Sequence, residues 1–114
     1  MKLKQSEAQI QKSILQYLNL LPKNEIFVFR VNVQGVPMVR NGRAIFRKAP
    51  HVGVADMLCV YRGLFVAFEI KSATGKQSPG QKVFQADVEK AGSFYFLVRS
   101  VDDVKSALIE INNQ

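Results

Sequence analysis

The chain of 114 residues contains one cysteine and one histidine. A single cysteine excludes an internal disulfide and a zinc site built on a cysteine pair, so we expect Cys59 to be a buried structural thiol. No apolar run is long enough to span a bilayer, and no apolar signal region follows the first residues. These absences predict a cytoplasmic protein, and the length favours a single domain over residues 1–114.

Acidic residues are scarce and unevenly placed. The chain has 16 lysines and arginines against 9 acids, a net charge of +7, and no acid lies between Glu25 and Asp56 or between Glu69 and Asp87. Basic side chains occupy both acid-free stretches, which predicts a polyanionic partner, DNA above all. A solvated basic surface kept for solubility is the alternative. The residues that we predict to contact nucleic acid are Arg30, Arg40, Arg43, Arg47, Lys48, Lys76 and Lys82.

The stretch from Asp56 to Glu69 predicts a β-hairpin, because apolar arms at 54–61 and 64–70 flank a short turn at Arg62-Gly63. Side chains two apart in a strand share a face, which places Glu69 beside Lys71. Asp56 and Glu69 lie about equally far from the turn, so strand pairing brings them close together. Charge on a mostly apolar hairpin is costly unless it is paired or holds a metal, and this cluster therefore indicates a site.

The remaining elements follow from caps and periodicity. Ser6, Ser78 and Ser100 are predicted N-caps of helices that run to about residues 20, 91 and 111. Strands are predicted at 25–33 and 93–99, and a ribbon at 38–40 and 43–46 around an Asn41-Gly42 turn. The order α-β-(β-β)-β-β-α-β-α predicts one α/β domain around a mixed sheet.

Two polar side chains fall on helix stripes that should face inward. Glu7 lies three residues before Ile10 on the stripe of the first helix, although a first-turn glutamate also complements the helix dipole in solvent. Gln81 lies three residues before Phe84 on the next helix, where it also completes a capping box with Ser78. Each residue is therefore a candidate for the site, with an ordinary structural role as the alternative.

Oxygen ligands on two neighbouring strands suit a hard divalent cation such as Mg²⁺, with Mn²⁺ as a substitute. Asp56 and Glu69 are the predicted metal ligands, and the backbone carbonyl of Ile70 is a third. Lys71 is placed to orient or deprotonate a water or to stabilise developing charge, and Glu7 could add an outer ligand through water. An edge-strand ion pair is the alternative for Glu69 and Lys71 taken by themselves.

The motifs G-V-A-D, E-I-K and S-P-G-Q, with S-E-A-Q-I-Q near the start, resemble those of the PD-(D/E)XK nuclease superfamily. More narrowly, the chain resembles the VRR-NUC (virus-type replication-repair nuclease) family over nearly its whole length. The resemblance implies a restriction-endonuclease-like αβββαβ core with a central mixed sheet flanked by helices. Ala55 stands where the superfamily name places proline, a residue that shapes the turn and carries no chemistry.

The residue roles that the resemblance implies match the chemistry above. Asp56 and Glu69 would be the metal-binding acids, Lys71 the catalytic lysine, Glu7 the acid of the first helix and Gln81 the glutamine after the motif. The resemblance also implies a homodimer similar to Holliday-junction resolvases.

The sequence therefore predicts a Mg²⁺-dependent endonuclease that cuts branched or structured DNA as a homodimer. Two alternatives stay open. One is a nuclease of this fold with another DNA target, since fold does not fix substrate. The other is a basic DNA-binding module without catalysis, in which the charged cluster is a structural ion network.

Overall fold

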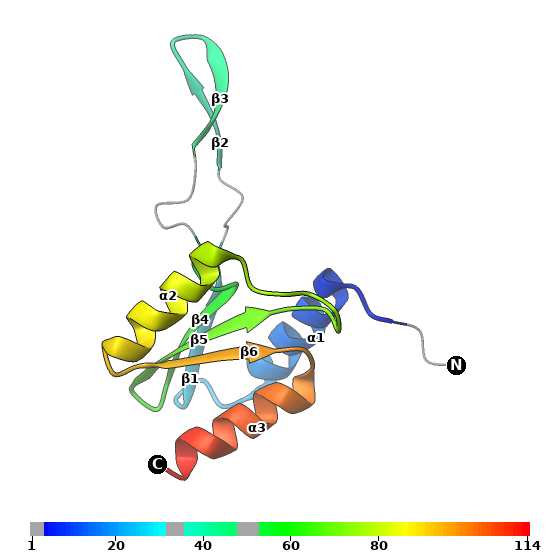
Figure 1. Cartoon of the computed structure of the whole chain (residues 1–114), viewed down its shortest axis with the longest axis vertical. Coiled ribbons are helices and arrows are strands. Elements are labelled where there is room, and N and C mark those ends of the chain that lie inside the picture. The colour runs from blue at the N-terminus through cyan, green and yellow to red at the C-terminus, as the bar shows by residue number, and fades with distance from the viewer. Residues whose placement is uncertain (1–3, 32–35, 48–52) are drawn as a thin grey trace.

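The computed structural model describes residues 4–31, 36–47 and 53–114. Three helices and six strands follow one another along the chain (Figure 1). Their bounds are α1 Glu7–Leu20, β1 Ile26–Arg30, β2 Val36–Arg40, β3 Arg43–Arg47, β4 Met57–Tyr61, β5 Leu64–Ile70, α2 Pro79–Lys90, β6 Phe94–Val98 and α3 Val101–Asn112.

Four strands form one mixed sheet in the order β1-β4-β5-β6. The pairs β1–β4 and β4–β5 are antiparallel, whereas β5 and β6 are parallel. Because parallel neighbours need a crossover connection, α2 lies between these two strands in the chain. The predicted mixed sheet is confirmed, but β2 and β3 pair only with each other and project from the body as a separate ribbon (Figure 1).

The two faces of the sheet carry different helices. On one face α1 and α3 pack against the main core, which includes Ile14, Leu18, Phe68 and Val104. On the other face, Phe84 and Val88 of α2 pack against a smaller cluster of Ala55, Ala67 and Tyr95. Strand alternation decides which residues face α2: Ala67 and Glu69 point to that side, whereas Phe68 and Ile70 point to the main core.

The two predicted tight turns are confirmed. Arg62 and Gly63 both have positive φ, 50° and 82°, and Asn41 and Gly42 have 52° and 75°. Positive φ at both central positions is the mark of the type I′ turn, whose twist matches that of the flanking strands. The β4–β5 turn sets the strand register and with it the geometry of the site.

The N-caps at Ser6, Ser78 and Ser100 are confirmed, and the first two form complete capping boxes. Three strand predictions differ from the structure. The strand predicted at 25–33 begins at Ile26 and ends at Arg30, with positions 32 and 33 outside the described residues, and the arm predicted from 54 becomes a strand only at Met57. The continuous apolar run at 93–99 favours a strand covered on both faces, but β6 lies at the edge of the sheet and most of its side chains are half-buried.

Cys59 is buried, as predicted, and burial raises the pKa of its thiol to about 12. The thiol therefore stays protonated and unreactive at neutral pH. Within the part of the chain that the structure describes, no helix is long and apolar enough to cross a membrane.

Gly53 brings the segment before β4 against the first turn of α2. Its φ is +78°, and a Cβ atom built on it would lie 2.2 Å from the backbone carbon of Gly80 and 2.5 Å from the backbone nitrogen of Gln81. Real atoms do not approach so closely, so only glycine fits. Gly53 therefore lets the chain that leads to Asp56 lie directly on the helix that carries Gln81.

We predict that Gly53→Ala lowers the free energy of unfolding more than Gly63→Ala does. Gly63 has φ +82° and nothing within 4 Å of an added Cβ, so its substitution carries only the cost of positive φ, about 1–2 kcal/mol. Gly53→Ala adds a backbone clash to the same cost. Urea denaturation of both variants measures the difference, and equal losses would contradict the close approach.

Candidate active site

Asp56 and Glu69 face each other across β4 and β5. The paired residues Met57 and Phe68 are the last of the β4–β5 ladder, and one further step of the same register sets Asp56 opposite Glu69. Side chains directly opposite in an antiparallel pair have Cβ atoms about 4.5–5.5 Å apart. The predicted proximity of the two carboxylates thus follows from the two-residue turn at Arg62-Gly63.

Asp56 is held by the backbone of the neighbouring strand. Its Oδ2 accepts a hydrogen bond of 2.8 Å from the backbone N–H of Ile70. In an extended strand the N–H and C=O of one residue point to the same side, so the Ile70 carbonyl oxygen faces Asp56 as well. The carboxylates of Asp56 and Glu69 and the carbonyl oxygen of Ile70 therefore lie at the same end of β5.

The Glu69 side chain is only 1% exposed. Its Oε1 accepts a hydrogen bond of 3.0 Å from Nε2 of Gln81 and lies 3.8 Å from Nζ of Lys71. Its Oε2 is buried, and none of the described residues gives it a hydrogen-bond partner. A buried oxygen without a donor is costly for an ionised carboxylate, which needs a proton or a cation at that position.

The pKa of Glu69 rises from 4.5 to about 8. Burial is the largest cause, followed by the hydrogen bond that the protonated form can donate to Asp56 and by the negative charge of Asp56. The Lys71 ammonium lowers the pKa, and the more distant Glu7 raises it slightly. At neutral pH the two carboxyl groups therefore hold a proton between them unless a cation replaces it.

Gln81 makes both a capping contact and a contact with Glu69, and its part in catalysis stays a prediction. Its Oε1 accepts from the backbone N–H of Ser78, 2.8 Å away, and so completes the capping box of α2. Its Nε2 donates to Glu69. Because the amide has an acceptor and a donor on opposite sides, one side chain both starts the helix and ties it to the site.

Lys71 lies under the loop that follows β5, and its side chain is 12% exposed. Arg99, at the end of β6, holds this loop: its Nη1 donates to the carbonyl oxygens of Ser72 and Gly75, the latter at 2.9 Å. A Cβ on Gly75 would lie 3.3 Å from Cδ of Lys71, so the loop packs closely on the lysine. Arg99 was not predicted from the sequence, because side-chain patterns do not reveal the two backbone carbonyl groups that it binds.

Tyr95 of β6 packs with Ala55 and Ala67 on the sheet face that carries Glu69, whereas its sequence pattern indicated only an apolar strand. Its hydroxyl accepts a hydrogen bond of 3.1 Å from Nε2 of Gln77, which also donates to Gln85. Burial raises its pKa to about 12, and the charges of Glu69 and Asp56 add to that rise. Tyr95 is thus a neutral hydroxyl at neutral pH, and it anchors the loop before α2.

Glu7 was predicted to face inward, and the structure contradicts this prediction. It is exposed in the first turn of α1, because the buried stripe of this helix begins at Ile10. It lines a groove of about 460 Å³ with other residues near the start of α1 and with Ser72 and Thr74 of the loop after β5. A direct metal contact has no support, and a contact through water stays a prediction.

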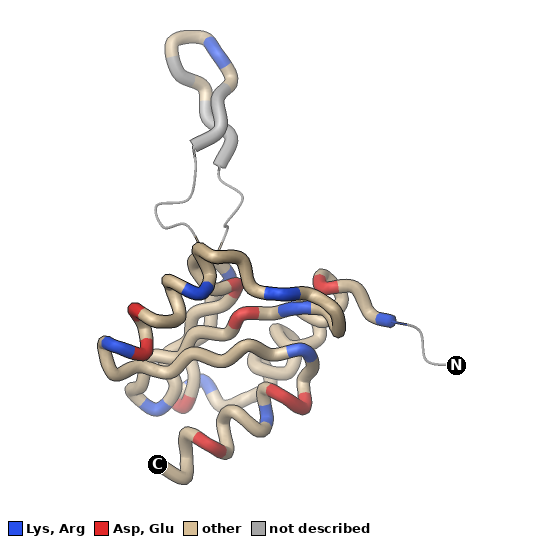
Figure 2. Tube along the Cα trace, viewed as in Figure 1, with Lys and Arg blue, Asp and Glu red and all other residues tan. Residues whose placement is uncertain are grey.

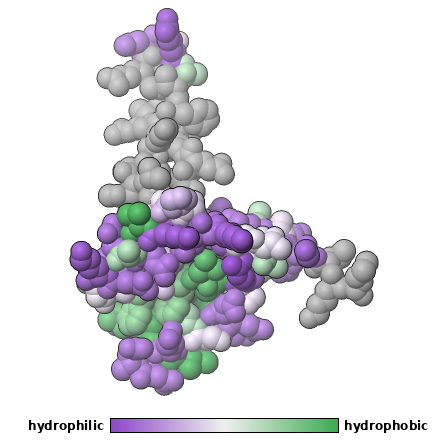
Figure 3. Space-filling view, viewed as in Figure 1, coloured by the Kyte–Doolittle hydropathy of each residue, from purple (hydrophilic) through white to green (hydrophobic). Residues whose placement is uncertain are grey.

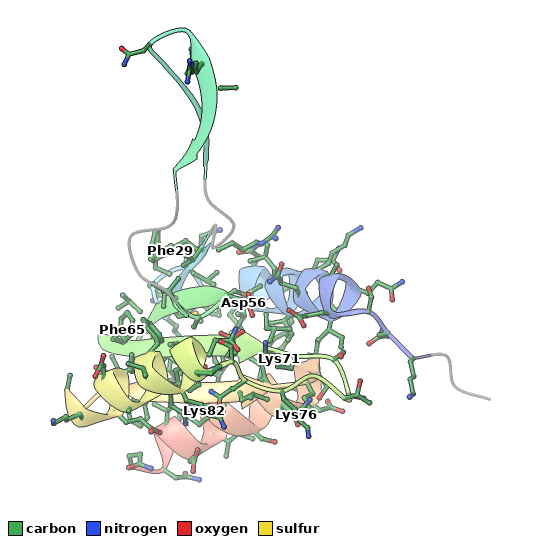
Figure 4. All side chains as sticks on the ribbon, turned by 45° about the horizontal axis from the view of Figure 1, so that its top comes forward. Phe29, Asp56, Phe65, Lys71, Lys76 and Lys82 are labelled. Atoms are coloured by element: carbon green, nitrogen blue, oxygen red, sulfur yellow. The ribbon has the colours of Figure 1, made fainter. Side chains whose placement is uncertain are left out.

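The basic residues predicted to bind DNA are spread over several elements. Lys76 and Lys82 are exposed on the loop before α2 and on its first turns, on the same side as Lys71 (Figure 4). Figure 2 shows basic positions along this loop and at the start of α2. Arg43 is exposed next to the ribbon turn, and Arg30 binds Oε1 of Gln11 on α1 through Nη2, at 2.6 Å. The side chains of Arg40 and Arg47, and Lys48 as a whole, lie outside the described residues.

The donor set fits a hard divalent cation. Among residues 4–31, 36–47 and 53–114, no group of three or more histidine, cysteine or acidic side chains could hold a metal. Two carboxylates and one backbone carbonyl suit Mg²⁺, which keeps several of its waters, better than they suit zinc. The partnerless Oε2 of Glu69 is the observation that favours a cation here.

No protein-family model and no curated protein matches the chain. Its fold is similar to that of a solved structure described as a VRR_NUC domain, with a TM-score of 0.60. The two sequences are 23% identical, and the similarity covers 93% of this chain and 97% of the other. The α/β fold implied by the sequence motifs is therefore confirmed, with a mixed sheet of four strands flanked by three helices.

We predict that, in EDTA, Glu69 makes the protein less stable as pH rises from about 4.5 to about 8. The folded state holds the Glu69 proton in this window while the unfolded chain has lost it, so each pH unit removes up to about 1.4 kcal/mol. The stabilisation is complete below pH 4.5 and lost above pH 8. Urea denaturation of wild type and Glu69→Gln across pH checks this, because the difference between their profiles should carry the slope. Parallel profiles would contradict a raised pKa.

Proposed function

We propose that this chain is a nuclease of the VRR-NUC family that hydrolyses DNA phosphodiester bonds with Mg²⁺. The observation that carries the proposal is the buried Glu69 carboxylate, which lies opposite Asp56 and beside Lys71 and has one oxygen without a partner. The similarity of the whole fold to a VRR_NUC domain supports it. An isolated structural ion pair would not need a second acid at the same end of the hairpin.

Asp56, Glu69 and the Ile70 carbonyl would hold the cation. When bound, a divalent cation supplies Lewis-acid chemistry, since it offsets negative charge on phosphate oxygens and makes water more acidic. The carboxylates gain as well, because a cation relieves their mutual repulsion and gives the buried Oε2 a partner. Metal binding should therefore be linked to the loss of the proton that Glu69 holds at neutral pH.

Lys71 would act on the attacking water and on the charge that develops at phosphorus. Hydrolysis adds the water oxygen to phosphorus, breaks the bond to one ester oxygen and leaves a proton on the departing oxygen. An ammonium 3.8 Å from Glu69 can orient the water and donate a hydrogen bond to a phosphate oxygen. Arg99 positions Lys71 through the loop carbonyls, and Gln81 positions Glu69.

The DNA backbone would reach the site along the exposed lysines near α2. Lys76 and Lys82 lie on the same side of the molecule as Lys71. Figure 3 shows hydrophilic side chains over α2 and the loop before it. The ribbon with Arg43 extends away from the body and could contact the backbone farther along. We propose branched DNA as the substrate and a homodimer as the active form, in which a two-fold axis would pair cuts on opposite strands.

We expect the wild type to cut a labelled four-way junction in Mg²⁺ or Mn²⁺ but not in EDTA. Asp56→Asn should lower the rate at least about 100-fold, since it removes a charged ligand from the cation. Asp102→Asn, which changes an exposed acid on α3, is the matched control and should cut normally. Matched duplex and single strand rank the substrates, and faster cutting of duplex would remove the preference for branches.

A folded, DNA-binding wild type that cuts no substrate would favour the non-catalytic module. Thermal unfolding with and without Mn²⁺ separates that outcome from a missing cofactor. A metal site stabilises the fold by mass action, by about 2.7 kcal/mol at 100 times the Kd, whereas an ion network gains nothing from the metal. Asp56→Asn should lose this gain.

We predict that Lys71→Ala lowers the cleavage rate at least about 100-fold with junction affinity changed less than about threefold, because the ammonium beside Glu69 would serve the reaction and not the binding. Lys76→Ala is the control, since this exposed lysine should weaken binding and reduce its salt dependence while leaving single-turnover cleavage at saturation unchanged. Cleavage rates and fluorescence anisotropy measure the two effects. Equal loss of binding and cleavage in Lys71→Ala would mean that Lys71 is a binding residue.

A further inference from the structure

The sheet face that carries Glu69 is only partly covered by α2. Two cross-strand rows on this face, next to the row that contains Asp56 and Glu69, follow from the strand registers. One row consists of Phe29, Leu58 and Ala67, and the other of Phe27, Val60 and Phe65. α2 covers the β5–β6 side of this face and leaves the β1–β4 side open.

Large apolar side chains are exposed on the open part. Phe27 is 64% exposed, Phe29 44%, Val60 45% and Phe65 37%. Figure 4 shows Phe29 and Phe65 on the same side of Asp56, away from α1. Together these four side chains, which we call the open apolar face, expose roughly 350 Å². The largest apolar patch on a typical monomer is about this size and is often functional.

A groove of about 360 Å³ lies beside the open apolar face, between Phe65 and the C-terminal half of α2. Phe84, Val88 and Ala91 line it with Phe65. The most exposed ring of the face, Phe27, stands two strands away from Phe65 in the same row. A surface with a protruding ring and an apolar groove is self-complementary, because a two-fold axis brings each ring to the other groove.

The charge around the groove disfavours nucleic acid as its occupant. Of the described residues that line it, the only charged one is Asp87, which would repel phosphate. Lys76 and Lys82 lie at the other end of α2, on the side of Lys71 (Figure 4), and the exposed Lys90 of the last turn follows the exposed Glu89 and does not line the groove. The two ends of α2 therefore suit different partners, and the apolar end suits protein.

The size of the face also suits a second copy. A standard interface covers about 800 Å² per partner, and the apolar share in homodimers is about 65%. The open apolar face supplies roughly 350 Å² of that apolar area, and the groove walls add more. We propose that two copies of this chain associate through the open apolar face and the groove beside it.

This proposal rests on the homodimer in the proposed function and adds the surface that forms it. The Phe29–Leu58–Ala67 row is adjacent to the row of Asp56 and Glu69. Because residues on one face of a strand are about 7 Å apart, the two rows are separated by about that distance. The two sites would therefore lie at the rim of the interface. Such a dimer would present both sites to one DNA molecule while its lysines stay outside the contact.

Light scattering after gel filtration tests the proposal without DNA or metal. We expect the wild type to have twice the 12.8 kDa mass of one chain at micromolar concentration. Phe27→Glu should be monomeric, because it places a charge at the centre of the contact. Ile109→Glu is the matched control, since Ile109 on α3 is 59% exposed but lies away from this face, and it should remain dimeric.

Circular dichroism confirms that each variant is folded, and Val60→Lys is a second substitution on the same face if Phe27→Glu unfolds. A monomeric wild type, or a dimeric and folded Phe27→Glu, would overturn the proposal. A monomeric wild type whose single-strand affinity falls in Phe27→Glu would instead assign the face to unpaired bases stacked on its rings. Asp56→Asn should stay dimeric, so failure of the nuclease and failure of the interface are distinguishable.

Discussion

The burial of the Glu69 carboxylate opposite Asp56 is the constraint on which the site depends. Two acids on adjacent strands repel each other, and the pKa of Glu69 rises to about 8 because burial, a shared proton and the Asp56 charge all oppose its ionisation. When Glu69 is ionised, only its Oε1 has partners, which are Gln81 and Lys71. The fold therefore maintains an unfavourable arrangement, and the strand register supplies the rigidity that keeps it.

The first turn of α2 helps to hold Glu69 in this buried position. A helix that caps its own N-terminus through Gln81 can direct the same amide at Glu69, so the helix cannot shift without loss of both hydrogen bonds. Gly53 allows the β4 segment to lie against this turn. Arg99 performs the corresponding task on the other side by holding the loop over Lys71. Hydrogen bonds from the Gln81 amide and the Arg99 guanidinium thus fix the two sides of the charged centre.

Much of this arrangement was predictable from local sequence rules. The caps at Ser6 and Ser78 and the turn at Arg62-Gly63 depend on neighbouring residues, and the turn alone determines that Asp56 faces Glu69. Glu7 was wrongly expected to face inward, because periodicity identifies a stripe but not where its burial begins. Arg99 and the open apolar face depend on distant backbone groups and on the area that α2 leaves uncovered, and no local pattern encodes either.

The β2–β3 ribbon is inserted between β1 and β4, and the residue that follows β1 lies beside the residue that precedes β4. Val31, directly after β1, donates its backbone N–H to the carbonyl of Asp56, and Gly53 lies three residues before Asp56. The ends of the inserted segment are therefore held together by the sheet and by α2, independently of what lies between them. Loops closed at such a base tolerate changes in length at small entropic cost. The length of the ribbon can thus change without displacing Asp56 from its place opposite Glu69.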